Sequence, residues 1–300
     1  MSKVLIIGAS GFLGRSLFTS FASNPNYETH GTETHGTYSQ RQRPQLDHLD
    51  IKNRYDVHAY IEQIQPNIVI HTAAVPDPDY CETNKKAAQQ LIVEGTKHVV
   101  GACQEINAQL IYISTTYVYG GEKAPYREKD PTDPINYYGK LKVKAENIVQ
   151  LLSLPWSILR FDFLYGYNGE GMPNGLVGKL LSGNQVKANS VQMRKPLFVD
   201  DVASAIKKII GVNGSGIYHL SGPDQITKYQ LCQRLATVVG VPVSNISPIK
   251  FEAQAAPRGN DTSLLTERLD ALDFIFTPID AALKIIGDEY AKRESLPTAT

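Results

Sequence analysis

The stretch that decides the fold is Val4-Leu-Ile-Ile-Gly8-Ala-Ser-Gly11-Phe-Leu-Gly14. Its unbroken apolar run is typical of a parallel strand buried on both faces. The GxxGxxG glycines that follow permit a tight turn, let the backbone approach a pyrophosphate, and open a helix whose N-terminus attracts phosphate. We therefore predict a dinucleotide-binding strand–turn–helix rather than an ordinary turn, which needs one or two glycines at most. Its expected cofactor contacts are Gly8, Ser10, Gly11, Phe12, Leu13 and Gly14.

Short β-branched runs alternate with amphipathic stretches over the first 160 residues. Strands are predicted at residues 4–7, 27–32, 67–71, 109–114 and 156–160. Helices are predicted at 15–23, 55–65, 87–105 and 137–152. Strands that alternate with helices of this length indicate βαβ units. The expected fold class is therefore α/β, with a Rossmann-like doubly wound parallel sheet.

This rhythm breaks after Arg160, because residues 161–195 show few clear periods. A strand at 196–200, a helix at 202–210 and a strand at 216–220 then resume the pattern. Two further helices are predicted at 228–239 and 281–290. We expect residues 1–160, with about 196–222, to form an NAD(P)-binding Rossmann domain. Residues 161–195 and 223–300 would form a smaller, interrupted α+β substrate-binding part.

Composition excludes several classes of protein. The 300 residues contain 30 Lys and Arg against 30 Asp and Glu, and 42% of them are apolar. A balanced charge disfavours nucleic-acid binding, and no apolar stretch approaches the roughly 20 residues that a bilayer span requires. Cys81, Cys103 and Cys232 lack metal-ligand spacing, and the histidines show no metal-binding pattern. We expect a cytoplasmic protein without a metal, a membrane span or disulfides.

A carboxylate at the end of the second predicted strand can determine which of the two nicotinamide cofactors is preferred. Glu33 lies at this position, about 25 residues after the first glycine. A carboxylate accepts hydrogen bonds from the ribose hydroxyls and repels a 2′-phosphate, which favours NAD(H) over NADP(H). Arg41 and Arg43 follow closely and could hold that phosphate instead. Solvated loop charges remain the alternative for all three residues.

Tyr138 and Lys142 are four residues apart at the start of a predicted helix, so both project from one face. A free tyrosine has a pKa of about 10, and a nearby ammonium favours the phenolate. Tyr138 would thus become a usable proton donor, and Lys142 could also hold the nicotinamide ribose. Thr115 follows the strand at 109–114, where open α/β sheets place their ligands, and can hydrogen-bond a substrate carbonyl. We predict Thr115, Tyr138 and Lys142 as the catalytic residues.

Six motifs in this order resemble the extended short-chain dehydrogenase/reductase family over essentially the whole chain. They are the glycine loop, Leu49-Asp50-Ile51, His71-Thr-Ala-Ala74, Ser114-Thr115, Tyr138 with Lys142, and Pro196-Leu-Phe-Val-Asp-Asp201. The resemblance implies that Asp50 and Ile51 contact adenine. It also implies that Ala73 and Ala74 line the cofactor cleft.

Within this family, the chain is most similar to the dTDP-4-dehydrorhamnose reductases and their relatives, which include the regulatory β subunit of methionine adenosyltransferase. The likeness rests on Ser114–Tyr119, Asp79–Glu82, Gly216–Gly222 and Ala256–Arg258. It implies substrate contacts by Asp79, Thr116, Phe163 and Arg258.

The chain also departs from its relatives at several positions. Thr116 replaces the usual aspartate of the reductases, and Ile92 replaces an asparagine of the helix. Arg258-Gly-Asn260 replaces Arg-Pro-x-Asn. The dehydratases carry an Asp-Glu pair at 116–117, where this chain has Thr116 and Tyr117. We therefore disfavour a dehydratase.

The leading hypothesis is an NAD(P)H-dependent reductase of a keto group on a nucleotide-sugar, with the proton supplied by Tyr138. One alternative is a dinucleotide-binding regulatory subunit without catalysis, which Ile92 and the altered 258–260 motif favour. Another is a nucleotide-sugar epimerase that retains NAD⁺. In the family, the helices predicted at 87–105 and 137–152 often form a four-helix interface, which suggests a homodimer.

Overall fold

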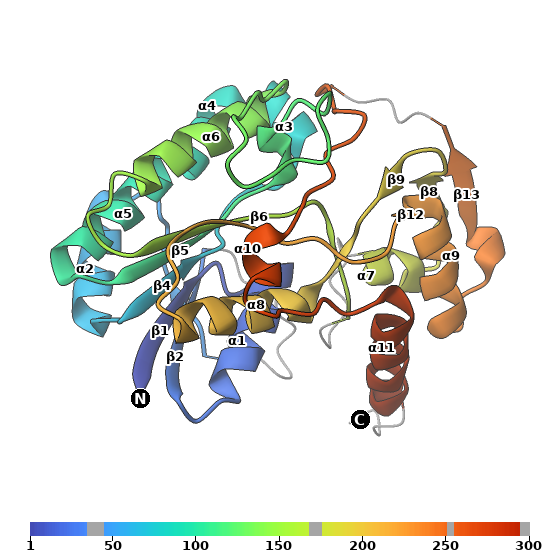
Figure 1. The fold of residues 1–300 in the computed structure, drawn as a ribbon. Coiled ribbons are helices and arrows are strands. Elements are labelled where there is room, and N and C mark those ends of the chain that lie inside the picture. Colours follow the sequence, from blue (N-terminus) through green and yellow to red (C-terminus); the bar gives the residue numbers. More distant parts are fainter. Residues whose placement is uncertain (35–44, 168–175, 251–254, 295–300) are drawn as a thin grey trace.

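The computed structural model describes residues 1–34, 45–167, 176–250 and 255–294 (Figure 1). Seven strands of this described part form one parallel sheet, in the order β11-β6-β5-β4-β1-β2-β3. Their bounds are β1 Ser2–Ile7, β2 Tyr27–Glu33, β3 Asp47–His48, β4 Ile68–His71, β5 Gln109–Ile113, β6 Trp156–Arg160 and β11 Gly216–His219. The strand order reverses between β1 and β4, as in a Rossmann-like doubly wound sheet. The predicted fold class is confirmed.

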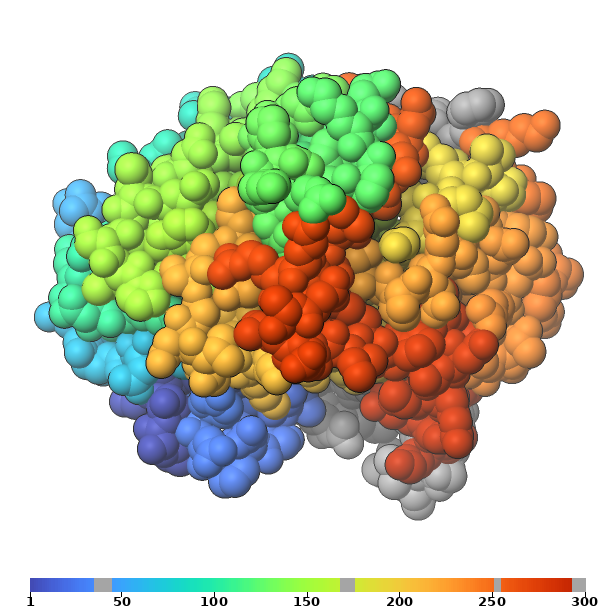
Figure 2. All heavy atoms as spheres, viewed as in Figure 1, coloured from blue at the N-terminus to red at the C-terminus, as the bar shows by residue number. Residues whose placement is uncertain are grey.

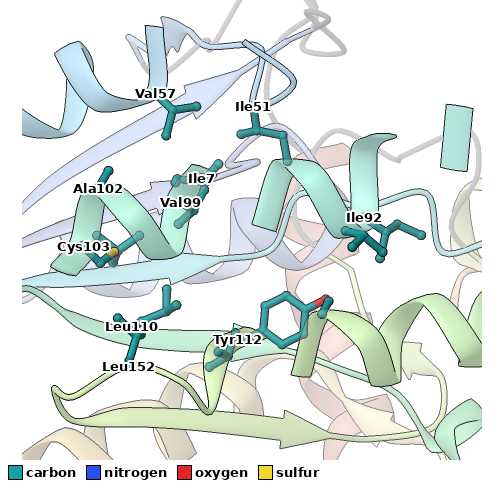
Figure 3. Close-up of a cluster of buried hydrophobic side chains, with 14 of the residues drawn as sticks. Ile7, Ile51, Val57, Ile92, Val99, Ala102, Cys103, Leu110, Tyr112 and Leu152 are labelled. Atoms are coloured by element: carbon teal, nitrogen blue, oxygen red, sulfur yellow. The ribbon is translucent and has the colours of Figure 1, made fainter. Parts of the chain in front are cut away.

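Helices cover both faces of this sheet. They are α1 Phe12–Ala22, α2 Arg54–Ile64, α3 Pro78–Thr83, α4 Lys85–Gln89, α5 Gly95–Ile106, α6 Tyr137–Val149 and α8 Val199–Gly211. On one face, α2, α5 and α6 pack on alternate strand residues such as Ile7 and Tyr112 (Figure 3). On the other, α1 and α8 pack on residues such as Ile6 and Ile111. Alternation along each strand thus explains the continuous apolar runs of the sequence.

The helix predicted at 87–105 is not a regular α-helix. A π-helical turn, Gln90–Glu94, separates α4 from α5, and the amide of Gly95 donates to the carbonyl of Gln90. Gly95 also lies against the core, where a Cβ would come 2.6 Å from Cδ1 of Ile51. The strand predicted at 196–200 is likewise shorter. Only Leu197–Phe198 forms β10, because Val199 already begins α8 and Asp200 and Asp201 favour its positive N-terminus.

Smaller elements gather beside the sheet and enclose a third apolar core (Figure 1). The strands are β7 Leu164–Tyr165, β8 Val186–Asn189, β9 Met193–Arg194, β12 Ile226–Thr227 and β13 Ile246–Ile249. The helices are α7 Leu176–Leu181, α9 Lys228–Val238 and α11 Ile279–Glu294, with a 3₁₀ turn at Val243–Asn245. Outside this group, α10 Glu267–Asp270 packs through Leu269 on the core of the α1 and α8 face, and a 3₁₀ turn at Thr116–Val118 follows β5. In the part of the chain that the structure describes, no helix combines the length and the hydrophobicity of a membrane span.

Residues 255–265, which we call the C-terminal strap, run back from this smaller part across the carboxyl edge of the sheet. Tyr126 donates its amide to the carbonyl of Ser263, and Leu265 donates to the carbonyl of Tyr126. Gly121 and Gly259 touch so closely that a Cβ on Gly121 would lie 2.5 Å from Cα of Gly259. Figure 2 shows the orange-red end of the chain lying across the visible face, directly against the green segment. The strap therefore joins the smaller elements to the sheet.

Candidate active site

The glycine loop lies where the sheet order reverses, at the carboxyl ends of β1 and β4. Gly8 has φ +88°, and a Cβ there would come within 2.9 Å of Thr72 Oγ1 and the amide of Ala73. Thr72 ties the two strands together by donating to the carbonyl of Ile7 at 2.8 Å. Ala73 and Ala74, two predicted cofactor residues, follow directly and are half-buried. The crevice at such a reversal is where open α/β sheets bind their ligands.

Glycine is needed at the three positions of the loop for different physical reasons. A Cβ on Gly14 would lie 2.1 Å from the carbonyl oxygen of Gly8, so the close packing of α1 on β1 requires this glycine. Gly11 has ordinary extended backbone, φ −71° and ψ 167°, and its nearest neighbour would be 3.4 Å from a Cβ. Neither backbone strain nor internal packing demands glycine at this position. A pyrophosphate that approaches the N-terminus of α1 does demand it, so the loop fits a dinucleotide.

The predicted adenosine contacts surround the same crevice. Glu33 is the last residue of β2 and is buried. Asp50 is half-buried beside Lys52, 3.2 Å away. Ile51 is buried in the core with its side chain against Gly95, and its carbonyl oxygen lies 2.9 Å from Nδ1 of His98. Arg41 and Arg43, the alternative 2′-phosphate ligands, lie outside the described residues.

Lys142 lies on the buried face of α6, and its ammonium is fixed at two points. Nζ donates to the hydroxyl of Tyr112 at 2.7 Å and to the carbonyl of Ile113 at 2.6 Å. Burial lowers the pKa of Lys142 from its ordinary value to about 7, although the charge of Glu146 opposes this shift. The lysine is thus held at the end of β5, immediately before Ser114 and Thr115.

Tyr138 is buried one turn before Lys142, on the same helix face. Its ring packs edge-on against Tyr117 at 5.8 Å between centroids. No hydrogen bond from another described residue reaches its hydroxyl. Burial raises the pKa of Tyr138, and Cys81 and Tyr117 raise it further, so the phenol carries its proton at neutral pH.

Two neighbours of Tyr138 explain why the start of α6 lies so close to Thr115. Asn136 caps the helix by accepting from the amide of Gly139 at 2.8 Å. Gly139 packs directly on the turn after β5, where a Cβ would lie 2.0 Å from the carbonyl oxygen of Tyr117. Thr115 begins that turn and accepts from the amide of Tyr117 at 3.2 Å. The structure therefore brings the three predicted catalytic residues to one edge of the sheet.

Behind Lys142 lies a buried polar chain that the sequence did not reveal. Tyr112 lies near Thr96, whose hydroxyl donates to the carbonyl of Ile92 at 2.6 Å. His71 Nε2 lies 3.2 Å from the same hydroxyl, and burial lowers the pKa of His71 to about 3, with help from the Lys142 charge. His71 is therefore neutral. This chain adjoins the position where Ile92 replaces the asparagine of relatives.

A buried ion pair, also missed from the sequence, supports the same edge. Arg160 binds Glu146 through Nε at 3.0 Å and Nη2 at 2.6 Å, and both side chains are almost fully buried. Ser114 donates to the same carboxylate at 2.5 Å. Glu146 lies one turn after Lys142, so the pair links α6 to the strand ends next to Thr115. Only the fold brings these residues together, since 32 positions separate Ser114 from Glu146.

Asp79 and Arg258, both predicted to contact substrate, form an ion pair with each other. Two Arg258 nitrogens lie 3.2 and 3.1 Å from the two carboxylate oxygens. Arg258 also donates through Nε to the hydroxyl of Tyr117 at 3.2 Å. Arg258 and its hydrogen bonds lower the pKa of Asp79. Phe163, the remaining predicted aromatic contact, packs half-buried on the third core.

A small, open pocket lies between the turn after β5, the smaller elements and the strap. Thr116, which the sequence predicts as a substrate contact, is one of the residues that line it. Asp162 and Arg194 line it as well, 3.7 Å apart. Sequence reasoning missed both, because they lie in or beside the segment without periodicity. No group of three or more His, Cys, Asp or Glu side chains in the described residues is placed to hold a metal.

The fold and the glycine loop are those of an extended short-chain dehydrogenase/reductase. Residues 2–291 match the family model described as the RmlD substrate binding domain, and the chain belongs to this family. It is 33% identical over 281 residues to the bovine (Bos taurus) methionine adenosyltransferase 2 subunit beta, covering 90% of this chain and 82% of that protein.

A second curated relative is a dTDP-4-dehydrorhamnose reductase from Aggregatibacter actinomycetemcomitans, 29% identical over 236 residues and covering 76% of each chain. Among solved structures, the dTDP-4-dehydrorhamnose reductase of Bacillus anthracis in complex with NADP superimposes with a TM-score of 0.81. It shares 28% identity and covers 96% of this chain and 99% of that one. The predicted resemblance is therefore confirmed.

Proposed function

We propose that the chain is an NAD(P)H-dependent reductase of a keto group on a nucleotide-linked sugar. The observation that carries this proposal is the buried Tyr138 hydroxyl, which is protonated, has no hydrogen bond from another described residue, and belongs to the same helix face as the anchored Lys142, one turn away. Reduction of a carbonyl needs such a proton donor. Relatives in the same family carry the name dTDP-4-dehydrorhamnose reductase, which supports the substrate class.

Each residue of the site has a part in this reaction. A reduced nicotinamide, when bound at the glycine loop, supplies the hydride. Thr115 donates a hydrogen bond to the substrate carbonyl and orients it. Tyr138 transfers its phenolic proton to the carbonyl oxygen. Lys142, held by Tyr112 and Ile113, binds the nicotinamide ribose and stabilises the resulting phenolate when it is charged.

We further propose NAD(H) as the preferred cofactor, because the buried Glu33 lies at the ribose end of β2. The cofactor part would comprise residues 1–160 and about 196–222, and the substrate part residues 161–195 and 223–300. The separate apolar core of the smaller elements supports this division. We expect a cytoplasmic protein, and a homodimer through the adjacent helices α5 and α6, which gel filtration would test.

The proposal is tested by titrating the purified chain with NADH and with NADPH by fluorescence. Addition of dTDP-4-dehydrorhamnose should then oxidise the bound cofactor, which is followed by its absorbance. Tighter binding of NADH would support the role of Glu33. Binding without oxidation of either cofactor would contradict a reductase of this substrate class.

A second candidate is a regulatory subunit, favoured by the 33% identity to the beta subunit of methionine adenosyltransferase over 90% of the chain. In that case the dinucleotide would bind but no ketosugar would be reduced. Size-exclusion chromatography with a catalytic methionine adenosyltransferase subunit separates the two candidates. A stable complex together with absent turnover would establish the regulatory function.

A further inference from the structure

The pocket next to Thr116 contains a carboxylate, that of Asp162, and a guanidinium, that of Arg194, which face each other. Oδ2 of Asp162 and Nη1 of Arg194 lie 3.7 Å apart, which is too long for a direct hydrogen bond. An oxygen atom about 2.8 Å from both groups would fit this spacing. A hydroxyl at that point can donate to the carboxylate and accept from the guanidinium at the same time. Such a gap is where a bridging water or ligand hydroxyl is expected.

The surrounding structure fixes both groups in place. Arg194 belongs to β9, which pairs with β12, and it donates to Thr262 Oγ1 at 3.0 Å and to Gln192 Oε1 at 3.3 Å. Asp162 follows β6 by two residues and lines the same pocket as Thr116. The site therefore needs little rearrangement to receive a ligand, which lowers the entropic cost of binding.

The position of Asp162 relative to the catalytic edge is equally well defined. The amide of Thr116 donates to the carbonyl of Phe161 at 3.0 Å, which joins the ends of β5 and β6. Thr116 is the immediate neighbour of Thr115. Because Thr116 and Asp162 line one pocket, a substrate whose carbonyl is held by Thr115 would have its neighbouring groups next to this pocket. A hydroxyl near that carbonyl would reach the gap.

The surroundings of Asp162 also favour a hydroxylated ligand. Burial raises the pKa of its carboxyl and the charge of Asp261 adds to this, while Arg194 and Thr116 oppose it. A partly dehydrated carboxylate gains strongly from a ligand hydroxyl, because a hydrogen bond to a charged group is stronger than a neutral one. A ligand without that hydroxyl would displace water and leave the carboxylate poorly satisfied.

We propose that Asp162 and Arg194 together bind one hydroxyl group of the substrate, and that Asp162 makes the site selective for sugar-like carbonyl compounds. This inference rests on the proposed function and names the residue that determines its specificity. Arg194 serves as donor and Asp162 as acceptor to the same oxygen. Neither residue takes part in the proton transfer from Tyr138.

The test compares the wild type with Asp162→Asn by calorimetry, using NADH, dTDP and dTDP-rhamnose as ligands. Asp162→Asn should weaken binding of dTDP-rhamnose by about tenfold or more. It should leave the affinities for dTDP and NADH nearly unchanged, because neither ligand carries the hexose. Retained NADH binding also shows that the variant folds. If Asp162→Asn does not fold, Arg194→Gln, which removes the other half of the site, gives the same comparison.

Asp261→Asn is the matched control, because it removes a carboxylate from the same pocket. Asp261 is exposed and its carboxylate accepts from the amide of Ser263 at 2.8 Å. This variant should bind dTDP-rhamnose almost as the wild type does. Equal loss in both aspartate variants, or none in Asp162→Asn, would overturn the inference while leaving the reductase intact. A wild type that binds no dTDP-rhamnose would instead overturn the proposed function, and the inference with it.

Discussion

The guanidinium of Arg258 and the carboxylate of Asp79 form a two-pronged ion pair across 179 residues of sequence, with N–O distances of 3.2 and 3.1 Å. Asp79 also accepts from the amide of Ala256 at 2.8 Å. This pair fastens the C-terminal strap to α3. Because Arg258 also binds the hydroxyl of Tyr117, it connects the strap to the ring that packs on Tyr138.

We expect Asp79→Asn to loosen the strap without unfolding the chain. The pair is partly exposed, so its contribution to the free energy of unfolding is modest, about 1 kcal/mol. Amide hydrogen exchange should accelerate at Ala256 and in the strap, and not in β1 or β4. Arg258→Lys keeps the charge but not the two-pronged geometry, and should give a similar pattern. Unchanged exchange in both variants would show that other contacts hold the strap.

The glycine loop offers a matched pair of substitutions. Gly11→Ala should leave the Tm nearly unchanged, because its added Cβ meets no atom closer than 3.4 Å. It should weaken NAD(P)H binding by about tenfold or more, because the methyl group lies where the pyrophosphate approaches. Gly14→Ala should lower the Tm clearly, since its Cβ would lie 2.1 Å from a carbonyl oxygen. Equal loss of stability in both variants would refute the distinction.

Tyr138→Phe removes the proposed proton donor and little else, because no other described residue hydrogen-bonds to its hydroxyl. Turnover should fall by about 10² to 10⁴-fold, as expected for a lost general acid. The affinity for NAD(P)H should stay close to that of the wild type. Tyr117→Phe is the control, since it removes a hydroxyl from the neighbouring ring and should retain most of the turnover. A Tyr138→Phe variant with normal turnover would rule out the mechanism.

Lys142→Met should abolish reduction and yet stabilise the apo chain near neutral pH. The pKa of Lys142 is about 7 in the folded chain and about 10.5 when unfolded. Between these values the unfolded state binds a proton that the folded state lacks, so the wild type loses stability as pH falls from 10.5 to 7. The variant has no such loss. At pH 7 we expect a gain of about 2 kcal/mol after the two lost hydrogen bonds are counted.

Thermal melts of the wild type and Lys142→Met at pH 7 and pH 10 check this prediction. The Tm advantage of the variant should shrink as pH rises. Lys140→Met, two residues earlier on the same helix and exposed, is the control and should show no such pH dependence. A Tm difference that is the same at pH 7 and pH 10 would mean that Lys142 stays charged in the folded chain.

Local patterns were sufficient to predict the sheet and its glycine loop. The runs that became β1, β4, β5 and β6 are apolar on both faces, so their periodicity reflects burial directly. The π turn at Gln90–Glu94 was missed, because a helical pattern with one extra residue still reads as a helix. The strand predicted at 196–200 is too long, because a buried apolar residue such as Val199 fits the pattern of a strand and of a helix equally well.

The candidate site divides in the same way. Tyr138 and Lys142 could be found because their spacing on one helix face has a chemical meaning. Arg160 and Glu146 could not, since a buried ion pair needs two elements whose packing the sequence does not state. Asp162 and Arg194 come from segments without a regular period, and their proximity depends on how the strap crosses the sheet.

The single extra residue of the π turn shifts the phase of everything after it in the helix. A residue removed from Gln90–Glu94 would restore regular geometry and rotate α5 by about 100° against α4. Thr96, whose hydroxyl now contacts His71, would then leave the polar chain behind Lys142, and Gly95 would no longer face Ile51. The number of residues in this turn therefore sets the orientation of the polar chain behind Lys142. A one-residue deletion there would disturb the site more than many substitutions would.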